Sequence, residues 1–203
     1  NLTYIHNYVL DNQHNVRWPM INQLGKKIVS DIDCYGLMMN HNEDLFVSDC
    51  EKGGGTIVAG GNGQGNQFNQ LKCPTFIFID REETVYVSDR DNHRVMKWMK
   101  GAKEGVVVAD GQGNGSSLKQ LSFPQGIVVN EIGDVFVTDR ENHRIMCWLL
   151  GSQEGHVVID GNHWMPWLNQ LNYPQDLSFD AENNLYVIDY SNNRIQQFDI
   201  DTQ

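Results

Sequence analysis

The sequence predicts an all-β protein, a β-propeller whose blades are repeated four-stranded sheets. Residues 85–98 return as 135–148 and, in weaker form, as 185–198. The aspartate within this segment recurs every 50 residues, and a fixed period of about 20–50 residues is typical of repeat architectures. Each repeat holds short apolar stretches rich in β-branched residues, which favour strands over helices.

Each of the two complete units is predicted to form four antiparallel strands, which are separated by polar or glycine-containing turns. In the first unit the strands are 76–79, 85–87, 95–98 and 106–109. In the second they are 127–129, 135–137, 145–148 and 157–159. Glycine-rich linkers separate the units, which places blades at residues 31–61, 62–111, 112–161 and 162–203.

Two of these four units lack a segment. Asp49 precedes Asp89 by only 40 residues, because the turn and the third strand of the unit at 31–61 are missing. We therefore expect this blade to be three-stranded or distorted. The last unit stops after its third strand, and residues 2–5 are a candidate strand to close it. Residues 1–30 are interpreted as a degenerate first unit or as such a closing strand.

The composition argues against some classes of binding partner. With 15 Lys and Arg against 26 Asp and Glu, the 203-residue chain has a formal net charge of −11. This balance argues against DNA and weakens an RNA-binding interpretation, since both need a positive surface for phosphate. No apolar run approaches the ~18 residues of a membrane span. Glycosylation sequons at Asn1 and Asn114 slightly favour an extracellular location, which is otherwise left open.

One repeat carries a recognisable pattern. Pro-Gln-Gly-Ile-Val-Val-Asn at 124–130 is followed by Val-Phe-Val-Thr-Asp and then Asn-His-Arg-Ile at 142–145, which resembles an NHL repeat. The same pattern is found at 74–95, at 174–195 with Asn in place of His, and in part at 34–49. The resemblance implies a propeller, usually of six blades, that mostly serves as a binding surface for proteins or RNA. One branch of the family, similar to the peptide-amidating lyases, is enzymatic.

The polar residues of the repeated turn combine groups suited to acid–base chemistry. Because they recur in every complete blade, we interpret them as structural: Asp and Asn bond the turn backbone, and Arg pairs with a carboxylate. The set comprises Asp89, Asn92 and Arg94, then Asp139, Asn142 and Arg144, then Asp189, Asn192 and Arg194.

Residues that occur once are better candidates for a binding site. In the last linker the glycine-rich sequence is replaced by a stretch that contains His163, Trp164, Met165 and Trp167. Trp and Met are favoured at the centres of interfaces; the alternative is that the two tryptophans cover an exposed sheet end. We predict these four residues, with His41, as the surface that contacts a partner.

The sequence predicts no metal site and no cofactor, because no pair of its seven histidines has helical metal-ligand spacing. Its four cysteines do not form a disulfide framework. Cys34 begins the first strand of its unit and Cys50 ends the second, so antiparallel pairing places them nearly opposite. We predict that these two are the closest cysteine pair, near enough for a disulfide under oxidising conditions.

These observations together predict a non-enzymatic scaffold that binds a protein or peptide through loops at one end of the ring. One alternative is a metal-dependent lyase or hydrolase with its chemistry at the propeller axis. Another is an RNA-binding module, which requires the basic residues to cluster on one face. The sequence leaves the partner, the oligomeric state and the closure of the ring open.

Overall fold

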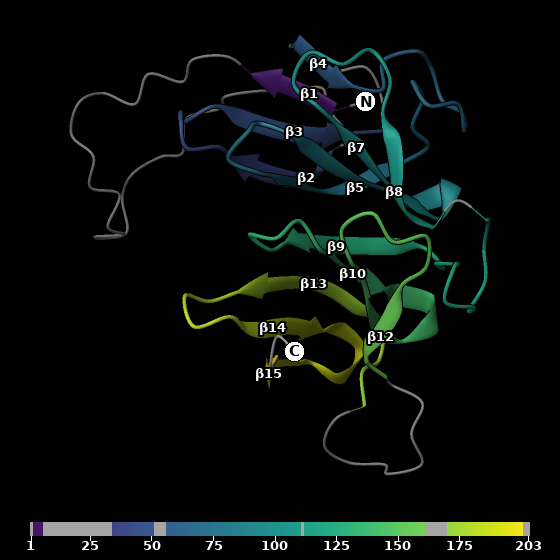
Figure 1. The fold of residues 1–203 in the computed structure, drawn as a ribbon, viewed down its shortest axis with the longest axis vertical. Coiled ribbons are helices and arrows are strands. Elements are labelled where there is room, and N and C mark those ends of the chain that lie inside the picture. The colour runs from purple at the N-terminus through teal and green to yellow at the C-terminus, as the bar shows by residue number, and fades with distance from the viewer. Residues whose placement is uncertain (1, 6–33, 51–55, 111, 161–169, 201–203) are drawn as a thin grey trace.

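The computed structural model describes residues 2–5, 34–50, 56–110, 112–160 and 170–200. Within them, four antiparallel sheets stack face to face as the blades of a propeller arc (Figure 1). The predicted all-β propeller fold is therefore confirmed. No helix in the described ranges is long and apolar enough to cross a membrane.

The blades follow one another along the chain, and within blades 2, 3 and 4 the strands pair in sequence order. Blade 1 contains β1 (Leu2–Ile5), β2 (Cys34–Met39), β3 (Leu45–Asp49) and β4 (Thr56–Ala59). Blade 2 contains β5 (Pro74–Ile79), β6 (Val85–Asp89), β7 (Arg94–Trp98) and β8 (Val106–Asp110). Blade 3 contains β9 (Pro124–Val129), β10 (Val135–Asp139), β11 (Arg144–Trp148) and β12 (His156–Ile159). Blade 4 contains β13 (Pro174–Phe179), β14 (Asn184–Asp189) and β15 (Arg194–Asp199).

Blade 1 corrects two predictions. Its strand order is β2-β3-β1-β4, so β1 occupies the place of the missing third strand, with Thr3 opposite Val47 and Ile57. The blade is thus four-stranded rather than three-stranded, and residues 2–5 do not close blade 4, whose described sheet has three strands. The physical reason is that β1 in this position satisfies the backbone groups of two strand edges, whereas at β15 it would satisfy one.

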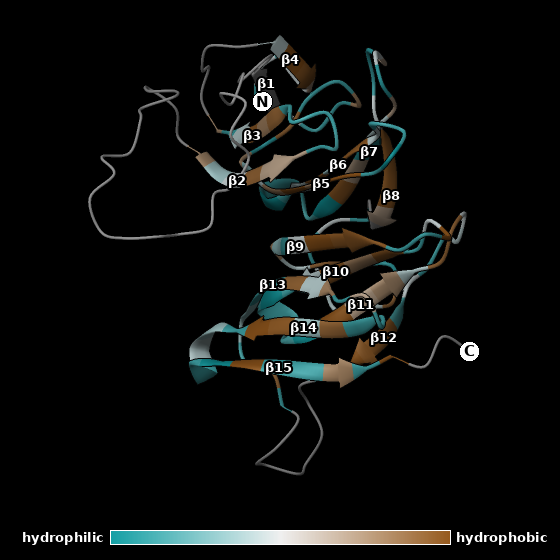
Figure 2. Cartoon of the chain, turned by 90° about the vertical axis from the view of Figure 1, so that its left-hand side faces the viewer, coloured by the Kyte–Doolittle hydropathy of each residue, from teal (hydrophilic) through white to brown (hydrophobic). Residues whose placement is uncertain are grey.

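The hydrophobic core lies between the blades rather than inside them. Figure 2 shows hydrophobic colour concentrated on the strands and hydrophilic colour on the turns. Trp98 packs with Phe46 and Ala59 of blade 1, and Trp148 takes the same place between blades 2 and 3. Gly105 makes room for the Trp98 ring, because a Cβ there would lie 2.7 Å from it. Each blade is therefore held by its neighbours, as expected for a repeat architecture.

Candidate binding pocket between the first two blades

The repeated polar set ties each blade to the linker that precedes it. In blade 2, Arg94 Nε donates to Asp89 Oδ2 at 2.7 Å, and Asn92 Nδ2 donates to the same oxygen at 2.8 Å. The backbone N–H of Lys72 donates to Asp89 Oδ1 at 2.6 Å, and Arg94 also donates to linker carbonyl oxygens, including that of Asn66. Blades 3 and 4 repeat the Asp–Arg ion pair within one blade at 2.7 Å. Burial raises the pKa of Asp89, and these hydrogen bonds oppose that shift. All of these contacts are internal, so we keep the structural interpretation.

The histidine of the repeated turn joins neighbouring blades. The backbone N–H of Phe123 donates to His93 Nδ1 at 3.2 Å, and the two rings meet edge to face with centroids 4.6 Å apart. His93 therefore has to be neutral at Nδ1 to accept this bond. Burial lowers the pKa of His93 below its ordinary value of 6.5.

We expect this histidine to make folding stability depend on pH. Because the unfolded chain binds the proton more readily, the contribution of neutral His93 is present above pH 6.5 and is lost as pH falls through the lower folded-state pKa. His93→Asn should flatten the stability curve in that window, since Asn193 fills the same left-handed position in blade 4. The check is urea denaturation of both proteins at pH 5 to 8; parallel curves would contradict the prediction.

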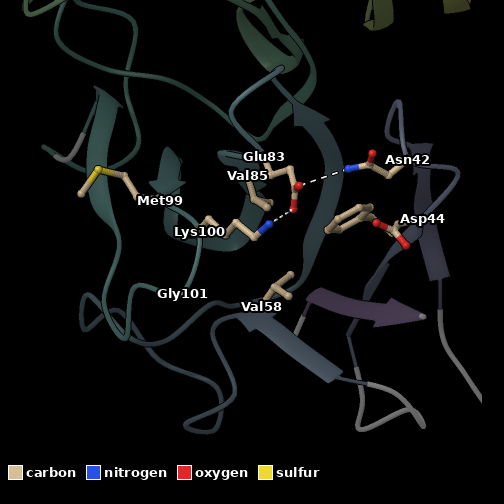
Figure 3. Close-up of a pocket in the computed structure, with 9 residues that line it drawn as sticks. Asn42, Asp44, Val58, Glu83, Val85, Met99, Lys100 and Gly101 are labelled. Atoms are coloured by element: carbon tan, nitrogen blue, oxygen red, sulfur yellow. Dashed lines mark hydrogen bonds and ion pairs between the residues drawn. The ribbon is translucent and has the colours of Figure 1, made fainter. Parts of the chain in front are cut away.

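A pocket of about 650 Å³ opens between blades 1 and 2, beside the turns that follow β2, β5 and β7 (Figure 3). Its lining residues are Asn42, Asp44, Phe46, Val58, Glu83, Val85, Met99, Lys100 and Gly101. The inner wall is apolar and rigid, because Phe46 and Val85 are almost fully buried. The rim carries Met99, which is 67% exposed. An apolar wall beside a few convergent polar groups is the usual composition of a ligand site.

Glu83 organises the polar side of the pocket. Its Oε2 lies 2.8 Å from Lys100 Nζ, and its Oε1 accepts a hydrogen bond from Asn42 Nδ2 at 3.2 Å (Figure 3). The carboxylate thus links the turn of blade 1 to two turns of blade 2. Glu83 has a φ of 58°, in the left-handed region where the equivalent residue of blade 3 is Gly133. Its side chain is mostly buried while Lys100 is 70% exposed, so the lysine is the partner that a ligand can displace.

The equivalent pocket between blades 2 and 3 lacks this chemistry. It measures about 270 Å³, less than half the volume of the first. Gly133 stands there in place of Glu83, and Leu150 in place of Lys100. The first pocket is therefore distinct from its repeat equivalent in both size and charge, which is what a binding site on a repeated scaffold requires.

A second hollow continues the first along β4. It has a volume of about 710 Å³ and shares Val58 and Gly101 with the first pocket. Residues 56–61 of β4 and the following turn form one side, and residues 101–104 form the other. β4 is one of the two edge strands of its sheet among the described residues, and β2 is the other. The two hollows together form the β4 groove.

Of the five predicted contact residues, the structure describes His41 alone. His163, Trp164, Met165 and Trp167 lie outside the described residues. His41 is exposed in the turn between β2 and β3, and its neighbour Asn42 lines the pocket. Glu83 and Lys100 were missed. A comparison of repeat positions marks Lys100 as a single-copy charge, because Leu150 and Ile200 are its equivalents, whereas Glu83 has an equivalent in Glu43 of blade 1. Among the described residues, no group of three His, Cys, Asp or Glu side chains is placed to hold a metal ion.

The predicted cysteine pair is wrong. Cys50 Sγ lies 2.9 Å from Cys73 Sγ in the next blade, whereas Cys34 is exposed. The physical reason is the register: Cys34 pairs with Asp49, and a register shift separates it from the regular pairing that begins at Leu37. Cys50 follows the end of β3 and points to the neighbouring blade.

The arc of stacked antiparallel sheets defines the chain as a β-propeller protein. Two of its repeat units, residues 121–148 and 171–198, match the model of the NHL repeat. No curated protein sequence matches the chain.

Solved structures share this fold. An auxiliary nutrient binding protein from Bacteroides thetaiotaomicron is 14% identical, with a TM-score of 0.60 over 81% of this chain and 47% of that one. Virginiamycin B lyase from Staphylococcus aureus is 14% identical, with a TM-score of 0.53 over 85% of this chain and 57% of that one. The chain thus spans about half the length of these proteins, and at this identity the likeness shows the fold alone.

Proposed function

We propose that the chain is a non-enzymatic propeller scaffold that binds an extended peptide segment of a protein partner in the β4 groove. The observation that carries this proposal is the pocket at the blade 1–blade 2 junction, which differs from its repeat equivalent in volume and in charge. Repeated features serve the fold, so a feature that departs from the repeat is the stronger candidate for function.

The shape of the groove suits a peptide. An extended segment that runs beside an edge strand gains main-chain hydrogen bonds, and pockets for alternate side chains supply specificity. Here β4 is an edge strand, and the apolar wall of Phe46, Val58 and Val85 accepts one large apolar side chain. Met99 at the rim has a flexible side chain that adapts to such a group.

The charges of the pocket set the orientation of the ligand. Glu83 is already held by Asn42, so a basic group on the peptide can replace the exposed Lys100 as its second partner. The acidic balance of the whole chain favours the same class of ligand. We therefore expect peptides with a large apolar residue next to Lys or Arg. The likeness to a lyase rests on the fold alone, and peptide binding is preferred on the geometry of the groove.

Selection from a peptide display library tests this proposal. Met99→Asp is expected to weaken the selected peptides at least about tenfold, because it places a charge at the apolar rim. Leu149→Asp is the matched control, since Leu149 holds the equivalent position in the next blade and is also exposed, at 54%. The proposal fails if no peptide is enriched, or if both variants bind equally well.

A further inference from the structure

The two cysteines that meet at the blade 1–blade 2 junction are already close to bonding geometry. Cys50 follows β3, Cys73 precedes β5, and their Sγ atoms are 2.9 Å apart. A disulfide bond is ~2.04 Å long, so a movement of less than about 1 Å separates contact from bond. Both residues carry thiols and are partly buried, at positions that small thiol reagents can reach.

The repeat shows what normally occupies this position. At the next two junctions the equivalents of Cys50 and Cys73 are Arg90 with Phe123 and Arg140 with Tyr173. Arg140 stacks over the Tyr173 ring at 4.9 Å from its centroid. The aromatic partner is held further by a histidine, since Tyr173 N–H donates to His143 Nδ1 at 3.1 Å.

The first junction cannot be held in the same way. A cysteine replaces the aromatic residue at 73, and the Asn-His-Arg sequence is missing after Asp49, so neither ring contact can form between these positions. Arg90 of blade 2 instead lies over the Tyr35 ring of blade 1, 5.9 Å from its centroid. The chain thus has a cysteine pair where its other junctions have an arginine and an aromatic ring. A covalent bond between the same two positions would serve the same purpose of joining neighbouring blades.

We propose that Cys50 and Cys73 form a redox-sensitive disulfide that fastens blade 1 to blade 2. The two thiols each lose a proton and together give two electrons to a disulfide oxidant such as oxidised glutathione, which leaves as two thiols. The new bond spans 23 positions of the chain and closes the loop that contains β4. It therefore controls the rigidity of the wall of the β4 groove.

The other two cysteines are poor competitors for this reaction. Cys34 is exposed at the first position of β2, at the end far from the turn that leads to β3. Its cross-strand partner is Asp49. Cys147 is buried in β11, and burial raises the pKa of its thiol to about 12, so it stays protonated and unreactive. Oxidation by a mild reagent should thus be selective for one pair.

Oxidation in a glutathione redox buffer, followed by peptide mapping under non-reducing conditions, tests the proposal. The expected product is an intramolecular cross-link between the peptides that carry Cys50 and Cys73, with a rise of about 5–10 °C in the thermal midpoint. Cys34→Ser should give the same product and the same rise. A link from Cys50 to Cys34, or mixed glutathione adducts without a Cys50–Cys73 link, would overturn the proposal.

A second variant separates redox control from a packing effect. Cys50→Arg with Cys73→Tyr rebuilds the pair found at Arg140 and Tyr173, and Tyr is compatible with the left-handed backbone of this position, as at Tyr173 itself. This protein should fold, and its thermal midpoint should be the same in oxidising and reducing buffer. A redox-dependent midpoint in this variant would show that another thiol is responsible.

Discussion

Asp139→Ala is expected to lower the free energy of unfolding by about 3–5 kcal/mol, because it leaves a buried guanidinium without its carboxylate. Asp139 is fully buried and accepts from the backbone N–H of Ser122 at 2.7 Å and from Arg144 Nε at 2.7 Å. Asn142 Nδ2 also donates to both carboxylate oxygens. The substitution therefore removes the acceptor of three donors at once, of which Asn142 Nδ2 keeps its hydrogen bond to the Gly115 carbonyl oxygen.

Asp189→Ala is the matched control for this prediction. Asp189 holds the same position in blade 4 and is equally buried, but the side chain of Arg194 is 33% exposed, against 9% for Arg144. The arginine left behind is then hydrated, so a loss of about 1–2 kcal/mol is expected. Urea denaturation of both variants measures the difference. Equal losses would show that the aspartate matters through the turn backbone alone rather than through the buried ion pair.

Much of the fold could be predicted from the sequence because the blades repeat. The 15-residue spacing between proline and aspartate corresponds to cross-strand pairing of Pro74 with Asp89 and of Pro124 with Asp139. The repeated sequence predicts the cross-strand pairing within one sheet, because strands joined by short turns have a fixed register. The predicted strands of blades 2 and 3 accordingly lie within the observed ones.

The wrong predictions concern contacts that the repeated sequence does not predict. β1 is four residues long and far from its partners in sequence, so no periodic signal marks its insertion between β3 and β4. The cysteine prediction considered pairing within a blade, whereas Cys50 meets a residue of the next one. The pocket was missed for the same reason, because Glu83 and Asn42 come from different blades. Stacking between sheets depends on side-chain packing, which a strand pattern alone does not specify.

Ile145→Ala is expected to cost about 2–5 kcal/mol, whereas Ile195→Ala should change stability by less than about 0.5 kcal/mol. The two isoleucines hold the same position in consecutive blades. Ile145 is fully buried, because it packs against Leu177 and Val187 of blade 4. Ile195 is 69% exposed, since no described residue covers the outer face of blade 4. The same change of side chain thus isolates the contribution of blade stacking.

The outer face of blade 4 carries further exposed residues whose equivalents in blade 3 are buried. Tyr186 and Ile188 are exposed on it beside Ile195, although their equivalents Phe136 and Thr138 are buried at the junction between blades 3 and 4. Thermal and urea denaturation of both alanine variants measure the stability lost at this exposed face and at the face buried between blades 3 and 4. A cost for Ile195→Ala that approaches that of Ile145→Ala would mean that another sheet covers the face, because a side chain exposed to water has little apolar burial to lose.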